Sequence, residues 1–138
     1  MKISTKGRYL LYFMIDLAEH KGEGYISLND IAVRQGVSKK YMEQLVKLLN
    51  HSGMLRTNRG SQGGYMLAKD PSEYTVGQIL RITEGGLTPI DCLEDEPNLC
   101  ERSKGCMTFP MWKELDRLVH EYLDGITLQS LIDNSKAS

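Results

Sequence analysis

Two short helices separated by a tight turn leave few architectures open to this chain. Ser27, followed three residues later by Asp30, forms a capping box that predicts the start of the first helix, and Gly36 suits the turn. Ser38 is placed to cap a second helix that runs to about Asn50, with an apolar stripe on one side and charged residues on the other. This pattern is typical of a helix-turn-helix.

A glycine-rich turn follows the second helix. Residues 54–57 and 65–67 are predicted to form two short strands, and the turn between them carries one cation, Arg59. A hairpin directly after a helix-turn-helix is the winged variety of that motif. The predicted fold class is therefore mainly α with a small β-hairpin wing: a winged helix-turn-helix. A compact helical domain with an incidental hairpin is the alternative, and it accounts less well for this order of elements.

The formal net charge of −1 hides a division of the chain. Residues 1–69 contain eleven Lys and Arg against five Asp and Glu, whereas residues 70–138 contain six against thirteen. Positive residues also crowd the start of a predicted first helix, Thr5 to Lys21, where the helix dipole favours acidic side chains. We expect an anionic partner to meet this basic half, although unevenly charged solvated faces would give the same counts.

The second helix of the helix-turn-helix carries side chains suited to reading bases in the major groove. Lys39 and Lys40 can reach phosphates or guanine edges, Gln44 can pair with adenine, and Glu43 can accept from the amino group of cytosine. Arg59 could enter a narrow minor groove, where the negative potential is strongest. The predicted partner is double-stranded DNA, and a structural wing with a solvated arginine is the alternative.

Thr75, followed three residues later by Gln78, predicts another capped helix, which Gly85 ends. Residues 87–109 then show neither helical nor strand periodicity, so they are expected to form a loop. This loop contains all three cysteines of the chain: Cys92, Cys100 and Cys106.

The chemistry of the cysteines narrows their role without fixing it. An odd number of cysteines in a cytoplasmic setting argues against a disulfide framework, and the lack of a Cys-x2-Cys pair disfavours a structural zinc site. Thiolates gathered on one loop suit an iron–sulfur cluster. Buried or reactive cysteines are the alternative.

The C-terminal part is predicted to contain a long helix from Pro110 to Asp124. Its apolar positions are spaced three and four apart, so they need a partner helix from this core or from a second copy of the chain. Thr127 is expected to cap a short final helix to about Ile132, with residues 134–138 as a frayed tail. The chain thus divides into a DNA-binding domain (1–84), a cysteine-bearing loop (85–109) and a dimerisation helix with a C-terminal cap (110–138).

Three segments, KISTKGRY at residues 2–9, SKKYMEQL at 38–45 and RGSQGGY at 59–65, resemble the IscR-type transcriptional regulators. The resemblance covers almost the whole chain and implies a winged-helix homodimer whose long C-terminal helix crosses its counterpart. It also implies that the second helix reads bases and that the wing arginine enters the minor groove. The predicted DNA-contacting residues are Lys2, Ser4, Thr5, Lys6, Arg8, Ser38, Lys39, Lys40, Tyr41, Glu43, Gln44, Arg59, Gly60, Ser61 and Gln62.

Cluster-binding members of this family place three cysteines in the same loop. The resemblance therefore implies that Cys92, Cys100 and Cys106 bind an iron–sulfur cluster, with a two-iron cluster favoured over a four-iron one. Phe109 stands where IscR supplies a histidine ligand, and Lys40 stands where IscR has a small hydroxyl residue. The operator of IscR is therefore not assumed for this chain. The fourth cluster ligand must come from another group, such as Asp91, Glu94 or a residue near the N-terminus of the partner subunit.

Two other classes of function are the alternatives to a cluster-sensing regulator. CymR-like members of the family need no cysteines, so a repressor of cysteine or sulfur metabolism, or a thiol-based sensor without a cluster, is the first. An enzyme is the second, and it is not predicted, because the sequence contains no phosphate loop, zinc-protease signature or nucleophile elbow.

The sequence also bears on location and on further partners. It has no apolar run of the roughly 18 residues that a membrane span needs, and its first residues lack the apolar stretch of a signal peptide. A cytoplasmic protein without a membrane partner is therefore expected. Whether RNA polymerase or a metabolic enzyme is a further partner stays open.

Overall fold

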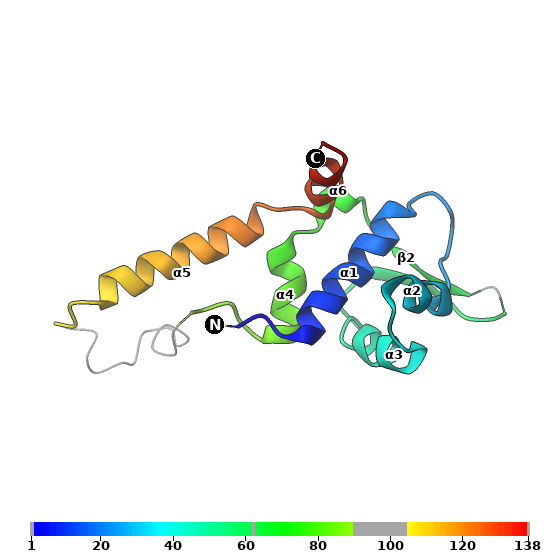
Figure 1. The fold of residues 1–138 in the computed structure, drawn as a ribbon, viewed down its shortest axis with the longest axis horizontal. Coiled ribbons are helices and arrows are strands. Elements are labelled where there is room, and N and C mark those ends of the chain that lie inside the picture. Colours follow the sequence, from blue (N-terminus) through cyan, green and yellow to red (C-terminus); the bar gives the residue numbers. More distant parts are fainter. Residues whose placement is uncertain (1, 62, 90–104, 138) are drawn as a thin grey trace.

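The computed structural model describes residues 2–61, 63–89 and 105–137. Helices and a hairpin form a body from which one long helix projects (Figure 1). This arrangement confirms the predicted fold class. Three of the predicted site residues, Gln62, Cys92 and Cys100, lie outside the described residues. The elements are α1 (Thr5–Glu19), α2 (Leu28–Gln35), α3 (Lys39–Lys47), β1 (Leu55–Asn58), β2 (Gly64–Leu67), the short 3-10 helix η1 (Pro71–Glu73), α4 (Val76–Glu84), α5 (Phe109–Asp124) and α6 (Leu128–Ala137).

Serine caps produce the helix-turn-helix, as the sequence predicts. The Ser27 hydroxyl accepts a hydrogen bond from the Asp30 amide at 3.1 Å, and the Ser38 hydroxyl accepts one from the Tyr41 amide at 3.0 Å. Each satisfies a backbone donor that the first turn of a helix leaves unpaired. Gly36, with a φ of 69°, adopts the left-handed conformation that ends α2 and turns the chain toward α3.

The C-terminal end of α3 differs from the prediction. The helix ends at Lys47 instead of near Asn50. The next amides, from Leu48 to Asn50, bond to carbonyls three residues back, which tightens the chain into turns. His51 then takes a φ of 67°, so the backbone cannot continue as a helix.

The wing is an antiparallel hairpin anchored to the start of α2. Leu55 pairs with Leu67 at its base, so β1 begins one residue later than predicted. The amide and carbonyl of Tyr65 both bond to Ile26 at 2.8 Å, which adds a bridge beside β2. A Cβ atom on Gly64 would lie 2.2 Å from the Ile26 carbonyl oxygen, so only glycine fits this close approach.

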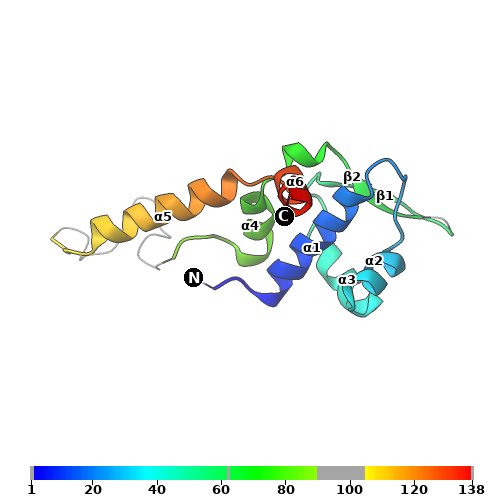
Figure 2. The ribbon, with the colours of Figure 1, turned by 45° about the horizontal axis from the view of Figure 1, so that its top comes forward.

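Helix α1 forms the centre of the body. Figure 2 shows it crossing the middle, with α4 and α6 on one side and α2 and α3 on the other. Leu10, Phe13 and Met14 on α1 are fully buried against side chains from these helices. Because each of the four neighbours packs on α1, this helix fixes where α3 and the wing lie.

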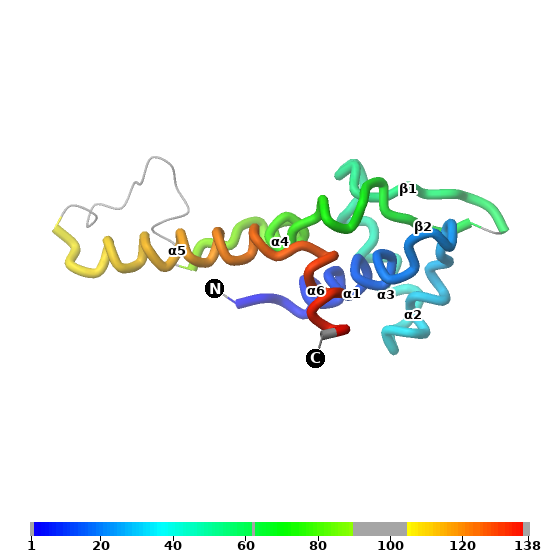
Figure 3. Tube along the Cα trace, turned by 90° about the horizontal axis from the view of Figure 1, so that it is seen from above, coloured from blue at the N-terminus to red at the C-terminus, as the bar shows by residue number. Residues whose placement is uncertain are grey.

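The C-terminal part of the structure differs from the prediction at the start of α5 and at the end of α6. Helix α5 begins at Phe109, one residue before Pro110, and projects from the body beside α4 (Figure 3). The Thr127 hydroxyl accepts from the Ser130 amide at 3.0 Å, which confirms the predicted cap of α6. The prediction of a frayed tail after residue 133 is wrong, because α6 continues to Ala137. Packing of Leu128 and Ile132 on the core holds this helix in place. No helix in the described ranges is long and apolar enough to cross a membrane.

Candidate nucleic-acid interface

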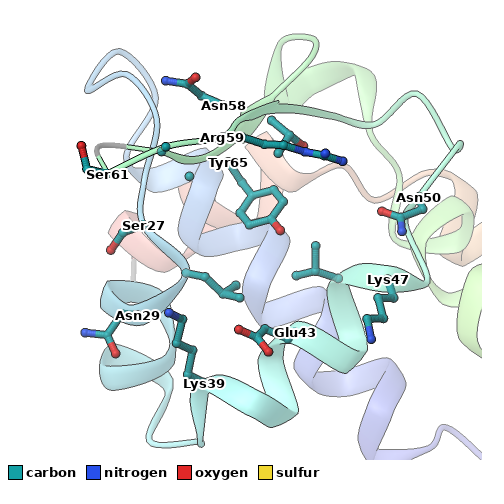
Figure 4. Close-up of a pocket in the computed structure, with 16 residues that line it drawn as sticks. Ser27, Asn29, Lys39, Glu43, Lys47, Asn50, Asn58, Arg59, Ser61 and Tyr65 are labelled. Carbon is teal, nitrogen blue, oxygen red and sulfur yellow. The ribbon is translucent and has the colours of Figure 1, made fainter.

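A cleft of about 610 Å³ lies between α3 and the wing. Figure 4 shows Lys39, Glu43 and Lys47 along one side of α3, with Arg59 on the hairpin across from them. The three α3 residues recur every four positions, so helical geometry places them on one face. The cleft thus combines a helix row of alternating charge with a cationic wing.

The predicted DNA-contacting residues divide into groups in the structure. Lys39, Glu43, Arg59, Gly60 and Ser61 line the cleft. Lys40 and Gln44 are exposed on the neighbouring row of α3 and do not line it. Ser38 and Tyr41 lie at the first turn of α3, where the Ser38 hydroxyl is used as the helix cap.

The cleft also contains residues that the sequence analysis missed: Ser27, Asn29, Lys47, Asn50, Asn58 and Tyr65. Lys47 could have been found from its spacing, four residues after Glu43 on the same helix face. Asn29 and Asn50 carried no such signal, because the tertiary approach of α2, α3 and the hairpin brings them to the cleft. Tyr65 points into the cleft in Figure 4 and packs its ring edge-on against Phe13, at 6.0 Å between centroids.

The basic residues before and within the first turn of α1 form a second predicted contact region. Lys2, Thr5, Lys6 and Arg8 are exposed. Ser4 is different, because its hydroxyl donates to Glu84 Oε1 at 2.6 Å and accepts from the Gly7 amide at 3.0 Å. The hydroxyl of Ser4 therefore already has intramolecular partners.

An aromatic contact joins this region to the recognition helix. Tyr9 on α1 lies edge-on to Tyr41 on α3, with 5.9 Å between ring centroids, and edge-on to Tyr12 at 5.6 Å. Edge-to-face pairs at this separation are favourable. The start of α1 and the start of α3 thus share one surface of the body.

A buried carboxylate fixes the angle between α1 and α2. The Asp16 side chain is only 4% exposed and accepts from Arg34 Nε at 3.0 Å and from Arg34 Nη2 at 2.7 Å. Gln35 Nε2 adds a third hydrogen bond at 3.3 Å. The hydrogen bond to Asp16 raises the pKa of Arg34 against the lowering effect of burial. Paired in this way, a buried charge is tolerated and the helix-turn-helix is held on the core.

Cys106 is the predicted cluster ligand that lies within the described residues. It is half-buried just before α5, and its Sγ lies 3.3 Å from the Thr108 hydroxyl, a group that can donate to a thiolate. Thiolate chemistry therefore fits a cluster at this cysteine. The described ranges contain no group of three His, Cys, Asp or Glu side chains placed to hold a metal ion. His20 and His120 bond to other groups, His20 with the Asp16 carbonyl and His120 with Arg81.

Helix α5 shows a different kind of surface. Four apolar side chains form an exposed stripe along it: Met111 (53% exposed), Leu115 (37%), Leu118 (48%) and Tyr122 (69%). Val119 and Leu123 pack beside α4, against Val76 and Leu80. The stripe follows the alternating spacing of three and four residues that helices use to pair along a seam.

An ion pair fastens the other side of α5 to α4. Arg81 binds both oxygens of Asp124, at 2.7 and 2.9 Å, and donates to His120 Nδ1 at 2.8 Å. A guanidinium carries only donors, so the proton of a neutral His120 lies on Nε2. The hydrogen bond from Arg81 lowers the pKa of Asp124, although burial raises it.

Comparison with known proteins places these features in context. Residues 3–134 match the Rrf2 family model, described as an iron-dependent transcriptional regulator. The chain is 44% identical over 131 residues to the transcriptional regulator CymR of Bacillus subtilis (strain 168), covering 95% of this chain and 89% of the relative. It is 37% identical over 134 residues to the regulator IscR of Serratia proteamaculans (strain 568), covering 97% and 80%.

Solved structures show the same two similarities. CymR (YrzC), the global cysteine regulator of B. subtilis, superposes with a TM-score of 0.77 at 40% identity, covering 97% of this chain and 98% of that one. IscR of T. potens superposes with a TM-score of 0.74 at 39% identity, covering 98% and 88%. Regulators of both kinds thus share this fold at similar identity.

Proposed function

Because the chain belongs to the Rrf2 family of transcriptional regulators, we propose that it binds a two-fold symmetric DNA operator as a homodimer. Its relatives are regulators and not enzymes, and DNA binding follows from membership of the family. The observation that carries the proposal is the cleft in which α3 and Arg59 face each other. An α-helix fits the major groove, and a wing beside it reaches the adjacent minor groove.

The side chains of the interface have different roles in this proposal. Gln44 and Glu43 read bases, because an amide pairs with adenine and a carboxylate accepts from cytosine. Lys39, Lys40 and Lys47 bind phosphates, which contributes affinity without sequence preference. Arg59 enters the minor groove beside Gly60, where the backbone can approach the DNA closely.

Pairing of α5 with α5 of a second copy supplies the dimer. The stripe of Met111, Leu115, Leu118 and Tyr122 is exposed along the length of the helix. Full burial of an exposed apolar side chain contributes roughly 1.5–3 kcal/mol, and these partly covered side chains each contribute a fraction of that. A two-fold axis through this seam places two α3 helices so that they read half-sites about one helical turn, or a multiple, apart. The chain then works as three parts: DNA-binding domain (1–84), cysteine-bearing loop (85–109) and dimerisation helix with its cap (110–138).

We further propose that Cys92, Cys100 and Cys106 bind an iron–sulfur cluster of the two-iron type. Three cysteines in one loop, the iron-dependent description of the family and the similarity to IscR support this assignment. The group would supply redox sensitivity at the segment that leads into α5. Cys106 and Thr108 sit directly before that helix, so the residues that hold the cluster adjoin the dimer seam.

A second candidate function is a cysteine-metabolism or thiol-sensing regulator without a cluster. The 44% identity to CymR favours it, as does Phe109 at the position of the IscR histidine ligand. Iron and sulfide counts on protein purified without oxygen, together with its visible spectrum, separate the two. A colourless protein after reconstitution with iron and sulfide supports the thiol-sensor function.

The proposed operator binding is tested by selecting duplexes from a random pool with the wild-type protein. Gln44→Ala is expected to lose roughly 1–3 kcal/mol on the selected site and to relax discrimination at one base pair. Lys39→Ala is the matched comparison on the same helix, and it should weaken selected and random duplexes alike. Equal losses on both duplexes for Gln44→Ala would show that Gln44 does not read a base.

A further inference from the structure

The last residue of α4 is bound to Ser4, the N-cap of α1, 80 positions earlier in the chain. Glu84 Oε1 accepts from the Ser4 amide at 3.0 Å and from the Ser4 hydroxyl at 2.6 Å. The Thr83 hydroxyl lies 3.2 Å from the same oxygen. One carboxylate oxygen therefore accepts from both donors of Ser4 at the point where α1 begins, and the single proton of the Thr83 hydroxyl is shared between this oxygen and the Leu80 carbonyl at 3.1 Å.

Gly7 makes this contact sterically possible. A Cβ atom at this position would lie 2.4 Å from Glu84 Oε1 and 2.9 Å from the Thr83 hydroxyl oxygen. Both distances are shorter than nonbonded atoms allow, so a larger residue would push the carboxylate away. Gly7 is also buried, which shows that the two helices meet here without intervening solvent.

The negative charge of Glu84 compensates for an unfavourable arrangement of positive charges at the start of α1. Helix α1 has no acidic residue in its first turn, and Lys2, Lys6 and Arg8 surround its positive dipole end. Glu84 supplies a carboxylate to this end from within the chain. Burial raises the pKa of Glu84, but the hydrogen bonds from Ser4 outweigh it, so the pKa lies below its ordinary value. The carboxylate is therefore ionised at neutral pH.

The same turn of α1 leads to the recognition helix. The exposed Lys6 and Arg8 precede Tyr9, whose ring packs on Tyr41 in the first turn of α3. A displacement of the start of α1 thus moves the basic residues and removes a support of α3.

We propose that Glu84 is a positioning residue for DNA binding, which holds the basic start of α1 and, through Tyr9, the first turn of α3. The inference rests on the proposed function, since it concerns the same DNA interface. Glu84 itself does not touch DNA. It acts through Ser4 and Gly7, which it fixes in place.

The sign of the effect separates positioning from simple electrostatics. A carboxylate near a DNA-binding surface repels phosphates, so its removal alone would strengthen binding. If Glu84 positions the basic residues, its removal weakens binding in spite of the lost negative charge. Glu19, exposed at the other end of α1, is the matched control for the loss of one negative charge from the same helix.

The experiment measures affinity of the full chain for a duplex selected by the wild-type protein, at several salt concentrations. Glu84→Ala is expected to bind about tenfold more weakly, which corresponds to roughly 1.4 kcal/mol, whereas Glu19→Ala binds no more weakly than wild type. The slope of log affinity against log salt should become shallower for Glu84→Ala by about one for each phosphate that the variant no longer binds. Glu84→Gln keeps an acceptor oxygen for Ser4 and should stay within about threefold of wild type.

Two further variants keep the test independent of charge and of folding. Gly7→Ala displaces the carboxylate without changing any charge, so it should weaken binding in the same direction. The double variant Ser4→Ala/Glu84→Ala should bind the duplex about as weakly as whichever single variant has the lower affinity, because both residues act through one contact. Circular dichroism establishes that each variant is folded at the assay temperature.

The proposal is overturned if Glu84→Ala and Gly7→Ala, both folded, bind the duplex as tightly as wild type or more tightly. The proposed function survives that outcome, because the wild-type protein still binds. A wild-type protein that selects no duplex overturns the proposed function and this inference with it.

Discussion

Helices α1 and α5 have nearly the same length, 15 and 16 residues, but opposite surroundings. Helix α1 buries seven of its residues, whereas α5 buries none. Both carry apolar side chains at helical spacing, so the difference lies in what covers them. Within a single chain the apolar face of α1 is covered by its neighbours, whereas α5 presents an apolar face that a second chain can cover.

The charged residues of α5 are arranged so that a second copy of the helix can approach the apolar stripe. Arg117 pairs with Glu114 and Glu121 on its own helix, so one positive charge offsets part of the negative charge beside the stripe. The pair with Glu114 lowers the pKa of that carboxyl group. Two copies of α5 can then approach with less repulsion between their acidic side chains than the sequence alone would give.

The same type of substitution, Leu→Ala, made in each helix should give the largest difference in unfolding free energy between them. Leu10→Ala on α1 removes a side chain with 0% exposure and should lower the free energy of unfolding by about 2–5 kcal/mol. Leu118→Ala on α5 starts at 48% exposure and should cost less, with a loss that grows with protein concentration, because only the dimer buries it. Denaturant unfolding at two protein concentrations measures both. Equal, concentration-independent losses would contradict the account of α5.

A charge placed in the stripe tests the seam itself. Leu115→Glu should weaken self-association by roughly 1.5–3 kcal/mol or more, because each dimer would bury two carboxylates. Sedimentation equilibrium measures this dissociation constant. Lys113→Glu, on the same helix but outside the stripe, is the control and should leave it nearly unchanged. A Leu115→Glu protein that associates like wild type would move the interface elsewhere.

Local signals in the sequence were sufficient for the starts of the capped helices but not for most helix and strand ends. Ser27, Ser38, Thr75 and Thr127 each cap the helix that the pattern predicts, because capping depends on residues three positions apart. The contact of Ser4 with Glu84 could not be predicted, since it joins residues 80 positions apart through tertiary packing.

The candidate site shows the same limit. Lys39, Glu43 and Arg59 were recognisable from residue chemistry, and they meet in the cleft. The DNA-contacting role of the full predicted set, and the cluster on the three cysteines, stay predictions. Asn29 and Asn50 join the cleft only because α2 and the turn after α3 fold toward the wing.

The smallest effect on stability is expected at the ion pair that joins α4 to α5. Arg81 holds the pKa of Asp124 below its ordinary value, so this ion pair stabilises the fold above the ordinary carboxyl pKa of about 4 and is lost as pH falls through the lowered pKa. Asp124→Asn should therefore cost under about 1 kcal/mol at neutral pH, since the pair is partly solvated, and the difference from wild type should shrink on acidification. Unfolding curves at pH 7 and pH 3 measure it. A difference that grows at low pH would contradict this sign.

The mass of the protein–DNA complex in solution tests the central claim most directly. Light scattering on the wild-type chain with one selected duplex should give two chains per duplex over a range of protein concentrations, because the paired α5 helices bring two α3 helices to one operator. A complex that contains a single chain, with undiminished specificity for the selected sequence, would contradict the account.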